Sequence, residues 1–363
     1  MHAATGGHVM KVAVAGGGTA GHIEPAMNIA DELTNRGIEV VAFGTSRGLE
    51  QTLVPERGYR LRDIPPVPFP RRLSLDVLTF PWRLRSAVQQ ATAILKQEQV
   101  SVVIGFGGYV ALPVYLAAQR LRLPIVVHEA NAKPGLANRV GALFAAHVFD
   151  TVQGSLRKAE TAGIPVRRTL INLDRAAHKA EALQYFGLVA DRPVLLVFGG
   201  SQGARKLNAA VEAVGANLIA EGWQVLHAIG AKNEDQHITD LPHYRTISYI
   251  DRMDLAYAIA DVAITRAGAM TVAELATVGI PAVFVPLPIG NGEQRLNALP
   301  IVTAGGGKLI ADAECTPEKL LALVEPWLDD DVRRAAGIAA KTVSSTAAAG
   351  RIVDVVTTLG ATA

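Results

Sequence analysis

Short apolar runs alternate along the whole chain with segments whose apolar residues recur at helical spacing. The runs are rich in β-branched residues and mostly lack polar alternation, which is typical of parallel strands covered on both faces. Segments such as 25–37 and 269–279 have helical spacing and end in glycine, a common helix stop. The pattern predicts an α/β fold with parallel sheets and right-handed crossovers. The ten predicted strands lie within residues 11–15, 39–44, 101–107, 124–130, 145–152, 193–200, 223–230, 245–250, 261–268 and 281–288.

The alternating pattern starts a second time near residue 193, after a polar stretch. We therefore expect two α/β domains, residues 1–167 and 168–343, in a chain of 363 residues. Residues from about 344 to 363 predict a final helix, which on its pattern alone could pack on either domain.

Composition narrows the possible classes of protein. The formal net charge of +2 does not by itself indicate a nucleic-acid-binding protein. The single cysteine, Cys315, excludes an intrachain disulfide framework and suits a reducing cytosol. Residues 1–11 lack the pattern of a secretory signal, and no run approaches 18 apolar residues. We expect any contact with a membrane to be made from its surface.

The first predicted strand runs into a glycine-rich turn. Gly16, Gly18 and Gly21 fit the spacing of a dinucleotide-binding turn, but no acidic residue ends the second strand, where residues 44–47 read Gly-Thr-Ser-Arg. Binding of NAD or FAD and a tight turn without a ligand both remain open. In either case the helix N-terminus favours a negative charge.

Two further turns of this kind follow. In residues 199–203, the Ser201 hydroxyl can donate to a phosphate, and Arg205 with Lys206 either favour an anion or form a solvated basic face. At the third turn, the amides of residues 269–272 start a helix and can hold a pyrophosphate.

Polar side chains follow the third turn. Glu274 suits hydrogen bonds from a ribose diol, or is a surface residue favoured by the helix dipole. Gln294 and Asn297 suit hydroxyl recognition, or cap a helix.

Five stretches together, at 16–33, 105–118, 126–139, 197–208 and 266–298, resemble the MurG family of N-acetylglucosaminyltransferases over nearly the whole chain. The resemblance implies a GT-B fold: two Rossmann-like domains facing a cleft, with the last helix crossing back to the first domain. One departure is Ala20, where many relatives carry glycine, so Ala20 is expected at an ordinary φ.

The resemblance also implies the reaction. An inverting transfer would move GlcNAc from UDP-GlcNAc to the MurNAc 4-hydroxyl of lipid I, forming lipid II for peptidoglycan. It implies no cofactor and no metal. It further implies a peripheral protein on the cytoplasmic face of the cell membrane, with cell-wall synthesis proteins as possible partners and no nucleic acid.

Site residues carried over from the family fall into two groups. Gly108, Tyr109 and His128 would lie on the acceptor side, although His128 equally suits a core position. The donor contacts would be Thr19, Ala20, Gly21, Asn131, Arg167, Ser201, Ile250, Ala269, Met270, Thr271, Val272, Ala273, Glu274 and Gln294.

His22 is the candidate general base. It lies in the first turn of a predicted helix, where the helix dipole lowers the pKa of an imidazole. A neutral histidine can accept the proton of the acceptor hydroxyl. His22 could instead only shape its turn, and Glu129 is a weaker candidate for the base.

Residues 71–85 are the candidate membrane contact, because apolar side chains there are interspersed with arginines. The same stretch also suits a partly buried helix and loop. Its apolar members are Leu73, Leu75, Leu78, Phe80 and Trp82, and its arginines are Arg71, Arg72, Arg83 and Arg85.

Two rival functions stay open at this point. One is another GT-B glycosyltransferase that uses a different nucleotide sugar. The other is a nucleotide-sugar-binding module without turnover.

Overall fold

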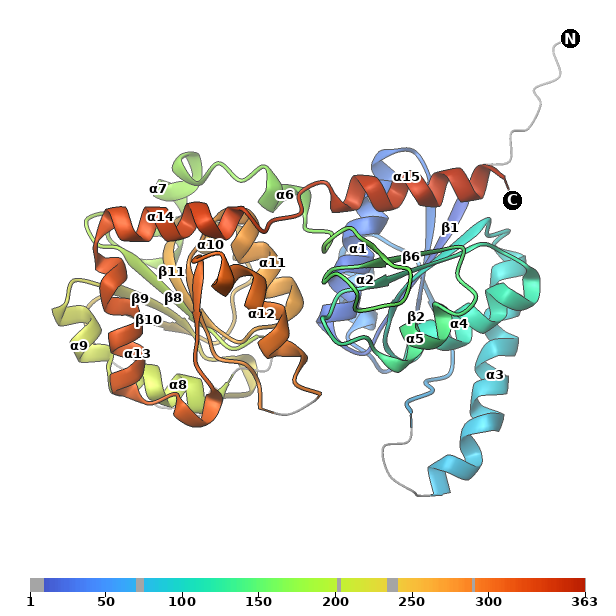
Figure 1. Ribbon diagram of the computed structural model, residues 1–363, viewed down its shortest axis with the longest axis horizontal. Helices are drawn as coiled ribbons and strands as arrows, with labels where there is room; N and C mark the ends of the chain where they lie inside the picture. Colours follow the sequence, from blue (N-terminus) through green and yellow to red (C-terminus); the bar gives the residue numbers. More distant parts are fainter. Residues whose placement is uncertain (1–9, 70–74, 201–203, 234–240, 289–290, 363) are drawn as a thin grey trace, which may run out of the picture. The chain divides into compact units, whose positions relative to one another are not determined.

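The computed structural model describes residues 10–69, 75–200, 204–233, 241–288 and 291–362. The chain divides into two compact units, which Figure 1 shows in the colours of the sequence. Unit 1 comprises residues 1–165 and 347–363, and unit 2 comprises residues 166–346. In the described part of the chain, no helix combines the length and the apolar character that crossing a bilayer requires.

Unit 1 is built on a parallel sheet in the order β3-β2-β1-β4-β5-β6-β7. Strand β1 turns Ala13 and Ala15 to the face covered by α3 and α4, and Val12 and Val14 to the face covered by α1 and α15. All four side chains are buried, as expected for a strand between two helical layers. The strands are β1 (Lys11–Gly16), β2 (Glu39–Gly44), β3 (Leu61–Asp63), β4 (Val102–Gly107), β5 (Ile125–Glu129), β6 (His147–Asp150) and β7 (Glu160–Thr161). The helices are α1 (Ala20–Asn35), α2 (Glu50–Glu56), α3 (Leu75–Gln97), α4 (Gly108–Leu121), α5 (Leu136–Gly141) and α15 (Ala348–Ala361).

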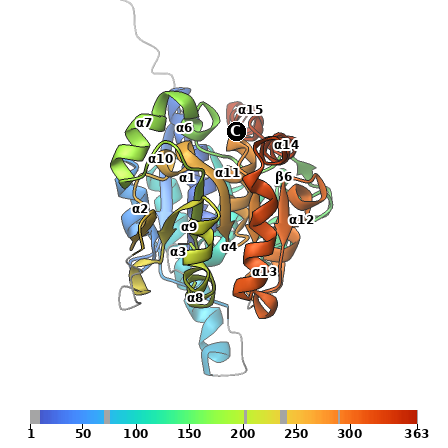
Figure 2. The ribbon, with the colours of Figure 1, turned by 90° about the vertical axis from the view of Figure 1, so that its left-hand side faces the viewer.

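Unit 2 has a second parallel sheet, in the order β10-β9-β8-β11-β12-β13. Leu195 and Val197 of β8 pack with α8, α9 and α13, while Leu196 packs with α7, α10 and α11 on the other face. Figure 2 turns the ribbon by 90° and labels these six helices. The strands are β8 (Val194–Phe198), β9 (Gln224–Ala228), β10 (Tyr244–Ile247), β11 (Ala260–Thr265), β12 (Ala282–Phe284) and β13 (Gly307–Leu309). The helices are α6 (Arg168–Ile171), α7 (Arg175–Phe186), α8 (Arg205–Ala213), α9 (Gly215–Ala220), α10 (Met253–Ile259), α11 (Ala269–Val278), α12 (Glu293–Thr303), α13 (Pro317–Val324) and α14 (Asp330–Lys341). Three 3₁₀ turns, η1 (Ala231–Asn233), η2 (Asp312–Glu314) and η3 (Glu325–Leu328), complete the described elements.

The strand order fixes where each unit can hold a ligand. Strand β1 lies between β2 and β4, and β8 lies between β9 and β11, so the order of connection reverses beside each unit's first strand. In open α/β sheets, ligands bind outside the carboxyl ends of the strands at such a reversal. The turns that follow β1 and β4 in unit 1, and β8 and β11 in unit 2, lie at these positions.

The predicted fold class is confirmed, and all ten predicted strands are present. The pattern missed β3, β7 and β13, which have only two or three residues and lie at sheet edges. Strand β12 is equally short but is buried throughout and lies within the apolar run 281–288, whereas most residues of β3, β7 and β13 are half-buried or exposed and give no apolar signal. The final helix, α15, packs Ile352, Val353 and Val356 into the core of unit 1.

Candidate active site

His22 lies where two glycine-rich turns of unit 1 meet. Helix α1 begins at Ala20, which therefore has helical backbone angles, and His22 stands in its first turn. The His22 Nδ1 atom is 3.0 Å from the Thr19 hydroxyl. A Cβ built on Gly107 would lie 3.3 Å from His22 Nε2, and one on Gly108 would lie 3.3 Å from Nδ1. The ring therefore packs against the turn between β4 and α4, where larger side chains would not fit.

Burial lowers the pKa of His22, and a hydrogen bond to the Gly17 backbone opposes the shift to a smaller extent. The imidazole is therefore neutral near pH 7 and can accept a proton. The direction agrees with the sequence analysis, and desolvation by burial is the larger of the two effects on this pKa.

Glu50 anchors the first glycine-rich turn, and the sequence analysis did not single it out. Its side chain is 0% exposed. Oε2 accepts from the Gly18 amide at 3.2 Å, and Oε1 accepts from the Thr45 amide at 3.1 Å and the Thr45 hydroxyl at 2.9 Å. The Tyr109 hydroxyl donates to the same Oε1 at 3.4 Å. One carboxylate thus joins the turns after β1, β2 and β4.

A sequence signal for Glu50 existed. A Cβ at Gly44 would lie 2.5 Å from Glu50 Cγ, and one at Gly48 would lie 2.0 Å from its Oε2. The stretch 44–50, Gly-Thr-Ser-Arg-Gly-Leu-Glu, therefore keeps glycine where the carboxylate passes. The acidic residue that appeared to be missing after the second strand comes six positions later and faces the glycine-rich turn.

Glu129 holds the loop after β5. Its side chain is buried and accepts from the amides of Asn131 at 2.9 Å and Gly135 at 3.0 Å, and from Asn138 Nδ2 at 2.9 Å. Tyr115 in turn donates to Asn138 Oδ1 at 2.8 Å. Burial raises the pKa of Glu129, and these hydrogen bonds oppose the rise. The carboxylate is occupied by its own loop, which favours a positioning role over that of a base.

His128 and Tyr109 differ in their surroundings. His128 is 0% exposed, its Nε2 is 2.8 Å from the Gly163 carbonyl oxygen, and burial lowers its pKa to about 4. This geometry favours the core position that the sequence left open. Tyr109 is half-buried, and a Cβ at Gly18 would lie 2.6 Å from its ring. Tyr109 therefore lies directly against the first glycine-rich turn.

In unit 2, Glu274 lies in α11 beside a buried tyrosine. The Tyr257 hydroxyl donates to Glu274 Oε2 at 3.0 Å. Burial raises the pKa of Tyr257 well above its usual value, Glu274 adds to the rise, and Arg167 opposes it. Arg167, Tyr257 and Glu274 therefore share one electrostatic neighbourhood. Sequence reasoning missed this contact, because the position of Tyr257 in α10 gives no hint of Glu274.

The loops after β11 and β12 are tied together by Gln294. Its Oε1 accepts from the Ala267 amide at 3.2 Å and from the Leu287 amide at 2.9 Å. Asn297 Nδ2 donates to the Ala267 carbonyl at 3.4 Å. Gly292 occupies the N-cap of α12, so neither amide caps that helix. Because Oε1 already accepts two hydrogen bonds, Gln294 would contact a ligand hydroxyl through its Nε2.

The remaining donor candidates are placed as follows. At the start of α11, Ala269, Met270 and Val272 are buried, and Thr271 and Ala273 are half-buried. Ile250 is buried after β10, and Ser201 lies outside the described residues.

The basic pair of the second turn has protein partners. Arg205 Nε donates to Asn233 Oδ1 at 3.1 Å, and Lys206 Nζ is 3.6 Å from an Asp312 carboxylate oxygen. These contacts weaken the argument that Arg205 and Lys206 indicate an anion at this turn.

Comparison with known proteins supplies the family. The family description "Glycosyltransferase family 28 N-terminal domain" matches residues 12–150, and "Glycosyltransferase family 28 C-terminal domain" matches residues 194–352. A relative from Streptomyces coelicolor is 55% identical over 89% of this chain and 91% of its own length. One from Mycolicibacterium smegmatis is 53% identical over 95% of this chain and 92% of its own. Both are named UDP-N-acetylglucosamine--N-acetylmuramyl-(pentapeptide) pyrophosphoryl-undecaprenol N-acetylglucosamine transferase.

Solved structures agree with this assignment. MurG from Acinetobacter baumannii is 30% identical, with a TM-score of 0.74 over 96% of this chain and 99% of that one. The glycosyltransferase VinC in complex with dTDP is 15% identical with a TM-score of 0.67, over 96% and 99% of the two chains, and shows the fold alone. The two parallel-sheet units of this chain have the GT-B fold, and the chain belongs to the MurG family of glycosyltransferases.

Proposed function

We propose that the protein transfers GlcNAc from UDP-GlcNAc to the 4-hydroxyl of the MurNAc residue of lipid I and so forms lipid II. The observation that carries this proposal is the identity of 53–55% to relatives named for that reaction, over about nine-tenths of each chain. The neutral His22 beside two glycine-rich turns supplies a group that a passive sugar-nucleotide binder would not need.

The chemistry assigns one step to His22. As the acceptor hydroxyl attacks C1 of GlcNAc, its oxygen forms the new bond and UDP departs with the electron pair of the old one. His22 takes the hydroxyl proton. Attack from the face opposite UDP inverts C1. Glu50 and Glu129 do not take this proton. Their oxygens accept hydrogen bonds from the loops after β1, β2 and β5, so the two carboxylates act by positioning these loops.

We assign the donor mainly to unit 2. The amides at the start of α11 would meet the pyrophosphate, Glu274 the ribose diol, and the Ile250 backbone the uracil. The family resemblance further implies donor contacts at Thr19, Ala20, Gly21, Asn131, Arg167 and Ser201. Helix N-termini and hydroxyls would thereby meet the charge that a metal meets in other transferases.

A transfer assay tests the function. Radiolabelled UDP-GlcNAc and a short-chain lipid I analogue should give a labelled disaccharide lipid, and the rate should be unchanged by EDTA. Label transferred only from another nucleotide sugar would support the rival transferase, and binding without product would support the passive module. Loss of activity on chelation, with recovery on adding a divalent ion, would overturn the metal-independent mechanism alone.

For Glu274→Ala we expect the KM for UDP-GlcNAc to rise about 10- to 100-fold, because hydrogen bonds to a charged group contribute roughly 1.5–3 kcal/mol. Steady-state kinetics with varied donor measures this effect. Glu318→Gln, which alters an exposed carboxylate of α13, serves as the control. An unchanged donor KM in Glu274→Ala would remove the ribose role.

We further propose that unit 1 docks on an anionic membrane surface through α3 and the segment before it. Leu78 is 65% exposed and Trp82 is 72% exposed, and Arg85 is exposed beside them. Phe80 instead packs against Phe69, with ring centroids 5.5 Å apart. Arg71, Arg72 and Leu73, together with the side chain of Leu75, lie outside what the structure describes. Exposed apolar anchors beside arginine favour interfacial binding.

The double variant Leu78→Ser/Trp82→Ser should bind anionic vesicles more weakly than the wild type while its affinity for UDP stays the same. Binding should also fall with salt, since each nearby arginine contributes about 1 kcal/mol on an anionic surface. Vesicle co-sedimentation measures both effects, with Val332→Ser on unit 2 as the control for loss of an exposed apolar side chain. Equal vesicle binding by the double variant and the wild type would refute this docking site.

A further inference from the structure

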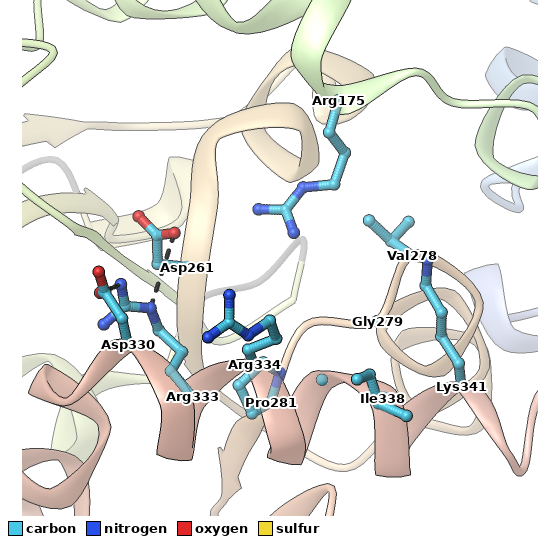
Figure 3. A pocket seen from close by; sticks show the side chains of 11 residues that line it. Arg175, Asp261, Val278, Gly279, Pro281, Asp330, Arg333, Arg334, Ile338 and Lys341 are labelled. Atoms are coloured by element: carbon cyan, nitrogen blue, oxygen red, sulfur yellow. Dashed lines mark hydrogen bonds and ion pairs between the residues drawn. The ribbon is translucent and has the colours of Figure 1, made fainter.

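Unit 2 contains a cavity of about 380 Å³ beside α14, which we call the α14 pocket (Figure 3). Asp261, near the start of β11, and Pro281, directly before β12, line it. The pocket therefore lies at the amino ends of these strands, whereas the turns of the candidate donor site lie at their carboxyl ends. It is a separate site, at the opposite ends of the strands of the same sheet.

Four cationic side chains and two carboxylates line the pocket. Both carboxylates face Arg333, which forms an ion pair with Asp330 and lies 3.8 Å from Asp261 Oδ1. Arg333 also donates to the Trp327 carbonyl oxygen at 2.6 Å. Arg333 is thus fixed in the wall, and the acidic charge of the pocket is concentrated around it.

The other three cations are differently placed. Among the described residues, Arg175 and Lys341 have no carboxylate within ion-pair distance. Arg334 pairs with Asp331, which does not line the pocket, and both side chains are largely exposed. Exposed ion pairs of this kind contribute little free energy to folding, so an incoming anion can displace Asp331 from Arg334. Figure 3 shows Arg175 pointing into the space from one side and Arg334 and Lys341 from α14 on the other.

Arg175 is held with its charge only partly compensated. Its Nε donates to the Ala258 carbonyl at 3.3 Å, and its Nη2 donates to the Ala260 carbonyl. Burial lowers the pKa of Arg175, the Asp261 carboxylate opposes this, and the positive Arg333 adds to it. Since arginine stays charged in proteins, an anion in the pocket would relieve this unfavourable environment.

The pocket is also preformed and has an apolar side. A Cβ at Gly337 would lie 2.7 Å from the Gly279 carbonyl oxygen, so α14 packs directly on the turn that ends α11. Val278, Pro281 and Ile338 supply apolar surface, and Ile338 is 64% exposed. A cavity of several hundred Å³ with convergent polar groups is typical of a small-molecule site.

We propose that the α14 pocket binds a small phosphate-bearing ligand. Arg175, Arg334 and Lys341 contact its phosphate, and Pro281 with Ile338 packs against its apolar part. Three cations around one group suit a phosphate dianion, and guanidinium groups bind phosphate oxygens in pairs. The phosphate comes either from a free organic phosphate or from a phospholipid headgroup. This site does not depend on the proposed glycosyl transfer.

Glycerol 3-phosphate and phosphatidylglycerol vesicles are the probes, used with the full chain and with saturating UDP to occupy the donor site. We expect Arg334→Gln/Lys341→Gln to bind at least one probe more than about tenfold more weakly than the wild type, because two hydrogen bonds to charged groups are lost. The control Arg245→Gln/Lys319→Gln removes two exposed charges elsewhere on unit 2 and should bind like the wild type. Calorimetry measures the first probe and co-sedimentation the second.

Each outcome of this test decides something. If the pocket variant binds only glycerol 3-phosphate more weakly, the ligand is a soluble phosphate. If it binds only the vesicles more weakly, the ligand is a lipid headgroup. Both results support phosphate binding in the α14 pocket. Failure of the wild type to bind either probe, binding of both probes by Arg334→Gln/Lys341→Gln as tightly as by the wild type, or equal weakening in the control variant overturns it. Both mutated side chains are exposed, so thermal unfolding should show an intact fold. Binding is read without turnover, so an inactive enzyme would leave this result interpretable.

Discussion

Replacing His22 with alanine should lower kcat about 10²–10⁴-fold, the usual contribution of a positioned general base. The affinity for UDP should stay close to that of the wild type, because the base acts on the acceptor hydroxyl in the transition state. Since burial lowers the pKa of His22, the acidic limb of the wild-type kcat profile should lie at lower pH than the ordinary pKa of an imidazole. This acidic limb should be absent from the variant.

Calorimetry of UDP binding separates the two roles of His22. His147→Ala is the matched control, because that histidine lies in β6 and pairs with Glu160 at 3.0 Å. A His22→Ala protein that no longer binds UDP would make His22 a residue that shapes its turn. One that binds UDP and turns over normally would remove it from the mechanism.

Glu50→Gln should lower kcat/KM for the acceptor about 100-fold, the scale expected when a group near the chemistry is misplaced by about 1 Å. Each Glu50 oxygen accepts from a backbone amide, Gly18 on one side and Thr45 on the other. A glutamine of the same shape must turn its NH₂ group toward one of these amides, so two donors face each other. We therefore expect Gln to perform no better than Ala at this position.

The comparison of Gln with Ala makes the prediction specific. If Glu50 only filled space, the isosteric Gln would retain activity and Ala would not. Glu56→Gln, an exposed carboxylate in the same helix, is the control. Acceptor kinetics and UDP affinity are measured separately, and thermal unfolding monitors the fold. Wild-type acceptor kinetics in Glu50→Gln would contradict the anchoring role.

The sequence predicted those parts of the molecule that follow from local pattern. The ten predicted strands and the glycine-rich turns after β1, β4 and β11 were readable, because burial on both faces and tight turns restrict residue types directly. Edge strands such as β13 were not readable, because only one of its three residues is buried, whereas the equally short β12 is buried throughout and lies within a longer apolar run.

Pairings between distant segments could not be read from local pattern. Glu50 binds the Gly18 amide 32 positions away, and Tyr257 binds Glu274 from another helix. Gln294 was recognised as a polar residue after a loop, but its two amide partners come from two different strand ends. Such contacts exist only once the sheets bring the carboxyl ends of their strands together.

The position of α15 has a consequence for how the protein folds as it is synthesised. Strands β1 to β7 leave the ribosome first, but the helix that covers Val12 and Val14 together with α1 is translated after all of unit 2. Until then, the surface that later receives Ile352, Val353 and Val356 is open to solvent. Exposed apolar surface of this kind makes folding intermediates prone to aggregation. Unit 1 therefore begins to fold first and is completed last.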